Sequence, residues 1–242
     1  MNKQLCFFIY LTLMSVGFIP GAMAEEGGLK LPQTRVIFDA KTKNAIAGIQ
    51  NRGKTVYLIK ASVLTGLQPD AARAPFAVMP PLFRLEPQNQ QTVRIVRQGT
   101  IKLPVDRESV FYLSFLAIPA VASKEQSVVR LSIGVQTVIK LFYRPAHLPL
   151  SPELAAEKII FNKKNNVLIA QNQTPYYLTF NTLSVDKKSV TTPYTPMMIA
   201  PFSTLEYPYA GDGKTVAWTV INDFGGISKP YHADITVTGT QQ

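Results

Sequence analysis

The stretch SVVRLSIGVQTVIKLFYRP, at residues 127–145, alternates side chains along most of its length. One set of alternate positions is almost entirely apolar and consists of Leu131, Ile133, Val135, Thr137, Ile139, Leu141 and Tyr143. A period of two residues is typical of a β-strand with one apolar face. Most strands have about 5–6 residues, and this stretch is about three times as long. The sequence therefore predicts one strand that is longer than its own sheet requires and apolar along its whole length.

The first 24 residues have the pattern of a secretory signal peptide. Lys3 provides a positive charge, an apolar segment follows, and Ala-Met-Ala at 22–24 fits a cleavage site. A membrane anchor is the alternative, but the apolar core has about 15 residues, fewer than the ~20 that span a bilayer. We predict export and cleavage of residues 1–24, and no later segment of the sequence is long and apolar enough to span a membrane.

Cysteine content and charge narrow the class of protein further. Cys6 is the single cysteine and leaves with the signal peptide, so the mature chain has no disulfide and no thiolate metal site. The formal net charge is +10, but lysine and arginine are scattered through strand-like segments without a run or a basic helix. We interpret this charge as favouring solubility and expect no nucleic-acid partner.

Strand-like segments form two sets separated by a proline-rich linker. Before the long strand stand TRVIFDA, NAIAGIQN, TVYLIKASVL, QQTVRIVRQ and VFYLSFLAI, and after the linker stand KIIFN, NVLIAQN, YYLTFNTLSV, MMIAPFSTLEYP, TVAWTVIND and HADITVTG. These segments are rich in β-branched and aromatic residues, whereas PELAAEK at 152–158 predicts one helical turn at most. The pattern predicts an all-β protein of two β-sandwiches of immunoglobulin-like size, at residues 25–145 and 153–242, with a linker at 146–152.

The sequence contains no constellation that would support catalysis. His147 and His232 have no partner at metal-ligand spacing. The GDGKT segment at 211–215 has Pro208 where a phosphate-binding loop has its first glycine, so we interpret it as a hairpin turn. With no serine elbow and no mature cysteine, we expect neither an enzyme, nor a cofactor, nor a metal site.

Six segments resemble the signature blocks of the periplasmic pilus chaperones of the PapD-like family. They are TRVIFDA (34–40), PPLFRLEP (80–87), LPVDRESVFYLSFLAIP (103–119), VQTVIKLFYRP (135–145), TPYYLTF (174–180) and INDFGG (221–226). The blocks follow the family's order from the first strand to near the C-terminus. The short interval from Pro119 to Ser127, without a cysteine pair, resembles the subclass with a short F1–G1 loop.

The resemblance implies two immunoglobulin-like domains in a boomerang arrangement and a chaperone that binds pilus subunits in the periplasm. Such a chaperone lends a strand to a subunit that lacks one, by donor-strand complementation, and delivers the subunit to an outer-membrane usher without an enzymatic step. The match places the donor residues at Leu131, Ile133 and Val135. The alternative is that this face packs inside its own sandwich, but an apolar strand longer than its sheet is an aggregation hazard unless a partner covers it.

Two further groups of residues match functional positions of the family. Arg35 and Lys140 match the pair that holds the subunit's C-terminal carboxylate, and we expect both to face an open cleft. In an unbroken register, Lys140 points away from the donor face. Glu108, Arg144 and Asp223 match a network of ion pairs between the two domains.

A structural pilus subunit or adhesin with immunoglobulin-like domains is the alternative function. Such a subunit requires a free, alternating extension at its mature N-terminus. The segment EEGGLKLPQTRVIF has acidic and glycine residues there instead, which favours the chaperone.

Overall fold

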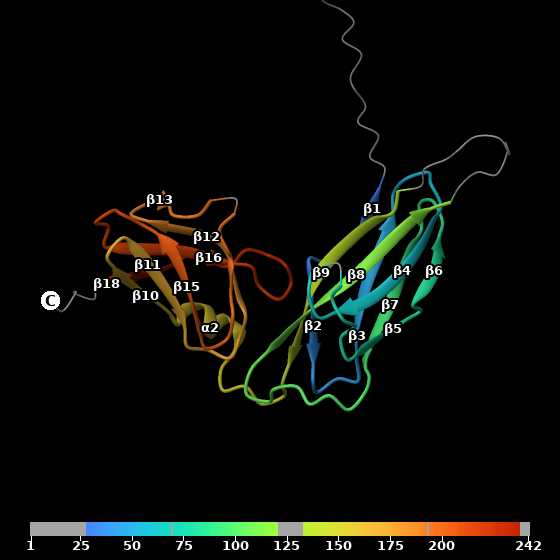
Figure 1. Ribbon diagram of the computed structural model, residues 1–242, viewed down its shortest axis with the longest axis horizontal. Coiled ribbons are helices and arrows are strands. Elements are labelled where there is room, and N and C mark those ends of the chain that lie inside the picture. Colours follow the sequence, from blue (N-terminus) through green and yellow to red (C-terminus); the bar gives the residue numbers. More distant parts are fainter. Residues whose placement is uncertain (1–27, 69, 121–132, 193, 238–242) are drawn as a thin grey trace, which may run out of the picture.

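The computed structural model describes residues 28–68, 70–120, 133–192 and 194–237. Over these residues the chain forms two immunoglobulin-like β-sandwiches, which confirms the predicted all-β fold. The two domains lie side by side and are joined at one end, in the boomerang arrangement (Figure 1). The predicted donor residue Leu131 lies outside the described residues.

The N-terminal domain packs two sheets face to face. One sheet has the order β1 (Leu29–Lys30), β3 (Asn44–Asn51), β7 (Gln90–Arg97) and β5 (Phe76–Met79). The other has the order β2 (Arg35–Asp39), β9 (Val135–Arg144), β8 (Ser109–Pro119), β4 (Tyr57–Leu64) and β6 (Leu82–Leu85). Alternate apolar residues of both sheets fill the core, among them Ile95, Leu113 and Leu141.

The C-terminal domain repeats this architecture. One sheet has the order β15 (Ser203–Pro208), β11 (Val167–Asn172), β10 (Ile159–Lys164) and β18 (Thr236–Val237). The other has the order β13 (Lys188–Ser189), β12 (Leu178–Val185), β16 (Thr215–Val220) and β17 (Tyr231–Asp234), and β14 (Met198–Ile199) also pairs with β12. Trp218 is buried in the core, where its indole N–H donates to the carbonyl oxygen of Ala156 at 3.1 Å.

Two local predictions in this domain are wrong. The segment predicted as one turn forms the helix α2 (Pro152–Glu157), because Ser151 caps its first turn, Pro152 suits the helix start, and Ala155 and Ala156 are buried against the core. The GDGKT segment does not form a hairpin turn, since β15 and β16, which it connects, belong to different sheets.

Strand β9 is shorter than the predicted strand. It starts at Val135, whose partner on β8 is Ala117, whereas Ile133 and Gly134 precede the strand. The next inward-facing partner position on β8 would be Pro119, which has no backbone N–H to donate. The β8–β9 register is unbroken, so the side chains of β9 alternate strictly between the core and the opposite face of the sheet.

The two edges of β9 are covered to different extents. Strand β8 pairs with β9 from Val135 to Tyr143, whereas β2 runs parallel to β9 and pairs with it only from Lys140 to Arg144. Among the described strands, none pairs with the second edge of β9 between Val135 and Ile139. This edge therefore has main-chain groups available for another strand.

Candidate functional site: the joint between the domains

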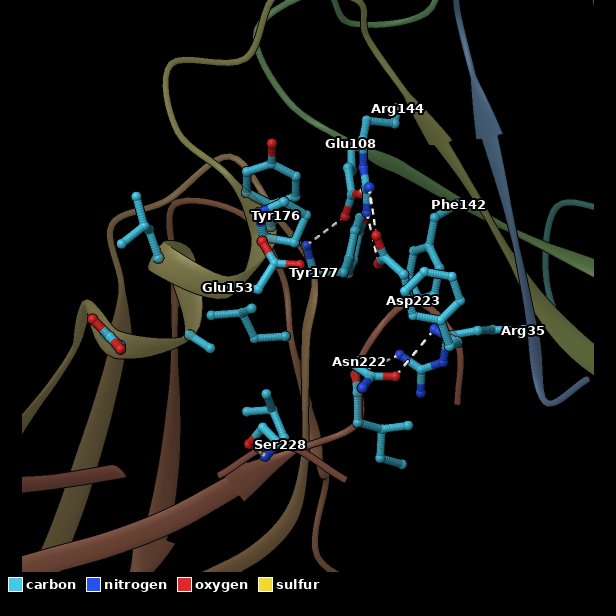
Figure 2. A pocket seen from close by; sticks show the side chains of 18 of the residues that line it. Arg35, Glu108, Phe142, Arg144, Glu153, Tyr176, Tyr177, Asn222, Asp223 and Ser228 are labelled. Carbon is cyan, nitrogen blue, oxygen red and sulfur yellow. Dashed lines mark hydrogen bonds and ion pairs between the residues drawn. The ribbon is translucent and has the colours of Figure 1, made fainter. Parts of the chain in front are cut away.

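A network of charged groups connects the two domains where β9 ends (Figure 2). Glu108 directly precedes β8, Arg144 is the last residue of β9, and Asp223 follows β16. Arg144 Nε donates to Glu108 Oε1 at 2.8 Å, and its two terminal nitrogens donate to the carboxylate of Asp223 at 2.6 and 2.8 Å. The backbone N–H of Tyr177 donates to Glu108 Oε2 at 2.9 Å. Glu108 and Arg144 thus both bind the C-terminal domain.

The network is largely shielded from water. Burial raises the pKa of Glu108, while the charge of Arg144 and the N–H of Tyr177 act in the opposite direction. Burial alone would lower the pKa of Arg144, but the hydrogen bonds to Asp223 and the charge of Glu108 raise it above its usual value. The network therefore stabilises the protein only when Glu108, Arg144 and Asp223 are all present, because a buried charge that loses its partner is strongly destabilising.

Further contacts across the joint were not predicted from the sequence. The rings of Phe142 and Tyr177 pack with their centroids 5.7 Å apart. The guanidinium of Arg107 lies 4.8 Å from the ring centroid of Phe202. These residues stand inside the resembling blocks or next to a strand, but nothing in their spacing indicates partners in the other domain.

Arg35 and Lys140 are direct neighbours in the parallel β2–β9 pair. The expectation that both face an open cleft is wrong for Arg35, whose exposed fraction is 8%. One of its terminal nitrogens donates to the carbonyl oxygen of Ile221 in the C-terminal domain at 2.9 Å, and its guanidinium lies 5.8 Å from the ring centroid of Phe142. Arg35 Nε is buried without a partner among the described residues. Arg35 therefore belongs to the interface between the two domains as well as to the surface next to that interface.

Lys140 keeps partial access to water. Among the described residues it takes part in no ion pair and no hydrogen bond of its side chain. Burial lowers the pKa of Lys140, and the charge of Arg35 lowers it further. The charges of Asp223 and Glu108 act on Arg35, but neither carboxylate forms an ion pair with Arg35 or Lys140 among the described residues. Two neighbouring cations in this state favour the binding of an anionic group.

The predicted donor face changes character along the chain. Leu141 is fully buried in the N-terminal core and Ile139 packs against it, as the alternative reading of this face requires. Towards the N-terminal end of this face, the exposed fraction rises to 57% at Val135 and 68% at Ile133. The same apolar face thus begins inside its own sandwich and continues into solvent.

A pocket of about 310 Å³ lies between the domains beside the ion pairs (Figure 2). Its walls include Phe142, Tyr177, Ile221 and Leu154, with Arg35 at one side. In the described part of the chain, no group of histidine, cysteine and acidic residues is arranged to hold a metal. No helix in that part is long and apolar enough to cross a membrane.

Comparisons with known proteins cover both domains. Residues 28–149 match the N-terminal domain of the family described as "Pili and flagellar-assembly chaperone, PapD", and residues 154–232 match the C-terminal domain described as "Pili assembly chaperone PapD". Among curated proteins, the chain is 37% identical to chaperone protein FimB/FhaD of Bordetella pertussis, over 88% of this chain and 91% of that protein. It is 34% identical to chaperone protein FimC of Escherichia coli, over 94% of this chain and 92% of that protein.

Solved structures agree with these relatives. The E. coli chaperone DraB is 36% identical, with a TM-score of 0.74 over 87% of this chain and 97% of that one. A chain in the complex of the Salmonella enterica SafA pilin with the SafB chaperone is 32% identical, with a TM-score of 0.74 over 86% of this chain and 96% of that one. With both domains matched in order, the chain belongs to the PapD family of pilus-assembly chaperones.

Proposed function

We propose that the protein binds pilus subunits in the Gram-negative periplasm, stabilises them by donor-strand complementation and delivers them to an outer-membrane usher. Membership of the PapD family supports this function, since the matched families and relatives are chaperones and not a class of enzymes. The structure of the SafA pilin in complex with the SafB chaperone supports a complex with a subunit. A structural subunit is not favoured, because the chaperone families match both domains.

The observation that carries the proposal is the state of β9 between Val135 and Ile139. This segment combines an unpaired strand edge with an apolar face that continues into solvent at Ile133 and Val135. The unpaired main-chain groups of such a strand can pair with a strand of another chain. Main-chain hydrogen bonds would satisfy the edge of the subunit, and the side chains of Leu131, Ile133 and Val135 would fill its groove.

The position at which β2 begins limits how far a strand of the subunit can extend along β9. Because β2 covers the edge of β9 from Lys140 onward, a strand that pairs with Val135–Ile139 stops beside Arg35 and Lys140. A subunit strand whose C-terminus reaches this point places its carboxylate against two cations, where charge-assisted hydrogen bonds hold it. This end point also fixes the register, which alternation alone leaves free to slip by two residues.

The remaining parts of the proposal follow the family resemblance. Residues 1–24 direct export and are removed, which leaves an N-terminal domain at 25–145, a linker at 146–152 and a C-terminal domain at 153–242. From the short sequence interval between Pro119 and Ser127 we infer that the protein belongs to the short-loop subclass. Glu108, Arg144 and Asp223 set the angle between the domains and so hold the anchor in place.

Co-expression with a fimbrial subunit and capture through an affinity tag on the chaperone test this function. The wild-type protein is expected to capture the subunit, whereas Ile133→Asp loses the complex, because it places an unpaired charge in an apolar groove. Ile101→Asp is the matched control, since Ile101 is similarly exposed, at 59%, but lies in the connection between β7 and β8, away from the proposed donor residues. Full recovery of the complex by Ile133→Asp contradicts the donor-strand proposal.

A further inference from the structure

The pocket between the domains, called here the interdomain pocket, lies on the linker side of the carboxylate anchor. Lys140, Phe142 and Arg144 project from the same face of β9 in that order towards the linker. Phe142 and Arg144 line the pocket, and Arg35 stands at its side (Figure 2). A residue whose carboxylate rests between Arg35 and Lys140 therefore has its own side chain next to the pocket.

The walls of the interdomain pocket are mainly apolar. Phe142, Tyr177, Ile221 and Leu154 of α2 contribute to its lining, as does Phe224, which is 93% exposed. A volume of about 310 Å³ is at the lower end of the range of small-ligand pockets, which is about 300–1,000 Å³. The pocket can hold one large side chain but not a folded segment.

The charges around the pocket favour an anionic group at only one point. Arg144 is neutralised by Glu108 and Asp223, and Lys229 pairs with Glu157 at 2.7 Å. Arg35 takes part in no direct ion pair among the described residues, although the charges of Asp223 and Glu108 oppose the lowering of its pKa by burial, and its buried Nε has no partner there. A ligand that combines a carboxylate with an apolar group thus matches the pocket and its cation together.

We propose that the interdomain pocket receives the side chain of the subunit's C-terminal residue and selects a large apolar one. This inference rests on the proposed function and adds a specificity determinant to it. Subunits that end in an aromatic or large aliphatic residue bind more tightly than those that end in glycine. Glu153 and Glu157 of α2 also line the pocket, so an acidic C-terminal side chain is disfavoured.

Titration of the isotope-labelled chaperone with minimal ligands, followed by NMR, tests this selectivity without a donor strand. The probes are N-acetylphenylalanine, N-acetylglycine and the amide of N-acetylphenylalanine. The phenylalanine acid is expected to bind about tenfold or more tightly than the glycine acid, as burial of its ring predicts. The amide loses most of this affinity because it carries no charge for Arg35 and Lys140. Equal binding of the two acids overturns the inference.

Filling the pocket provides the structural control. Leu154 is 51% exposed on α2, so Leu154→Trp is expected to fold, to occupy the pocket and to abolish the preference for the phenylalanine acid. Leu67→Trp, at a 65% exposed position of the N-terminal domain, should retain it. An unchanged preference in Leu154→Trp overturns the inference.

Subunit capture separates this inference from the proposed function. If the wild-type protein captures subunits but binds both acids equally, the proposed function is retained and the proposed selectivity of the pocket is contradicted. If it captures no subunit, the proposed function and this inference fall together, because the pocket then has no such occupant.

Discussion

Arg144 and Asp223 form a two-point ion pair across the domain boundary. The Nη1 atom of Arg144 donates to Asp223 Oδ2 at 2.6 Å and Nη2 donates to Oδ1 at 2.8 Å, while Nε remains for Glu108. The planar fork of a guanidinium matches a carboxylate in this way, and an ammonium group does not. We therefore expect the angle between the domains to depend on the identity of this side chain as well as on its charge.

Arg144→Ala is expected to destabilise the protein strongly. The substitution leaves Glu108 and Asp223 without their common partner, at a cost of about 3–5 kcal/mol in the free energy of unfolding. Arg144→Lys should recover only part of this stability. Urea unfolding followed by circular dichroism measures the change. Arg84→Ala is the control, since Arg84 pairs with Glu86 at an exposed site, where less than about 1 kcal/mol is expected. An Arg144→Ala protein as stable as the wild type contradicts a buried network.

Arg35 and Lys140 are expected to differ when each is truncated. Lys140→Ala should weaken subunit binding by about 2–5 kcal/mol and leave the fold intact. Arg35→Ala should weaken binding and also lower the free energy of unfolding by about 1.5–3 kcal/mol, because its hydrogen bond to Ile221 joins the domains.

The double variant tests whether the two cations act on one carboxylate. If they do, its capture of subunits is little worse than that of either single variant. Capture and thermal unfolding of all three variants check both statements. Wild-type capture by both single variants contradicts the anchor, and wild-type stability of Arg35→Ala contradicts its role in the joint.

Subunit binding is expected to weaken at alkaline pH. Burial and the charge of Arg35 lower the pKa of Lys140 in the free protein, and a bound carboxylate raises it again. Affinity is then full below the lowered pKa and falls as the pH rises through it towards the higher pKa of the complex. Because the pKa of Lys140 in the free protein lies below the ordinary lysine value of 10.5, the loss begins below pH 10.5.

Calorimetric titration at increasing pH measures this effect. Lys140→Arg should flatten the profile, because a guanidinium stays charged over this range. A constant affinity of the wild-type complex up to pH 10.5, with the fold intact, argues against the participation of Lys140.

A side chain at position 225 is expected to destabilise the protein. The φ of +83° at Gly225 lies in the left-handed region, and a Cβ atom there would come within 2.5 Å of Thr34 Oγ1 in the other domain. Gly225→Ala should lower the free energy of unfolding by about 1–2 kcal/mol through the backbone alone, with a further loss from the contact. Adding Thr34→Ala should recover only the stability lost through the contact with Thr34, not the loss through the backbone. Urea unfolding of the single and double variants measures both, and an unaffected Gly225→Ala protein contradicts this account of the turn.

Most of the fold could be predicted because the alternation of apolar and polar residues along a strand shows which of its faces is buried. Alternation with a period of two residues located nearly every long strand of both sandwiches, and the prolines after Arg144 marked the connection between them. The failures occurred where local patterns were ambiguous. PELAAEK is too short to show a helical period, and GDGKT has the composition of a hairpin although it connects two sheets.

The candidate site could be predicted less completely. The resemblance named Arg35, Lys140, Glu108, Arg144 and Asp223, and the structure brings the last three into direct contact. It also buries Arg35 against Ile221, a residue 186 positions away in the sequence. Nothing in the TRVIF segment carries information about such a partner.

The alternating chemistry of residues 127–145 was enough to indicate a strand with one apolar face, because alternation depends only on neighbours along the chain. The point at which that face leaves the core depends on where other strands stop. The structure shows Leu141 buried, Val135 exposed and β2 ending its cover of β9 at Lys140. Burial, charge pairing and an open edge are properties of groups that meet through folding, and they arise only when distant segments are brought together in space.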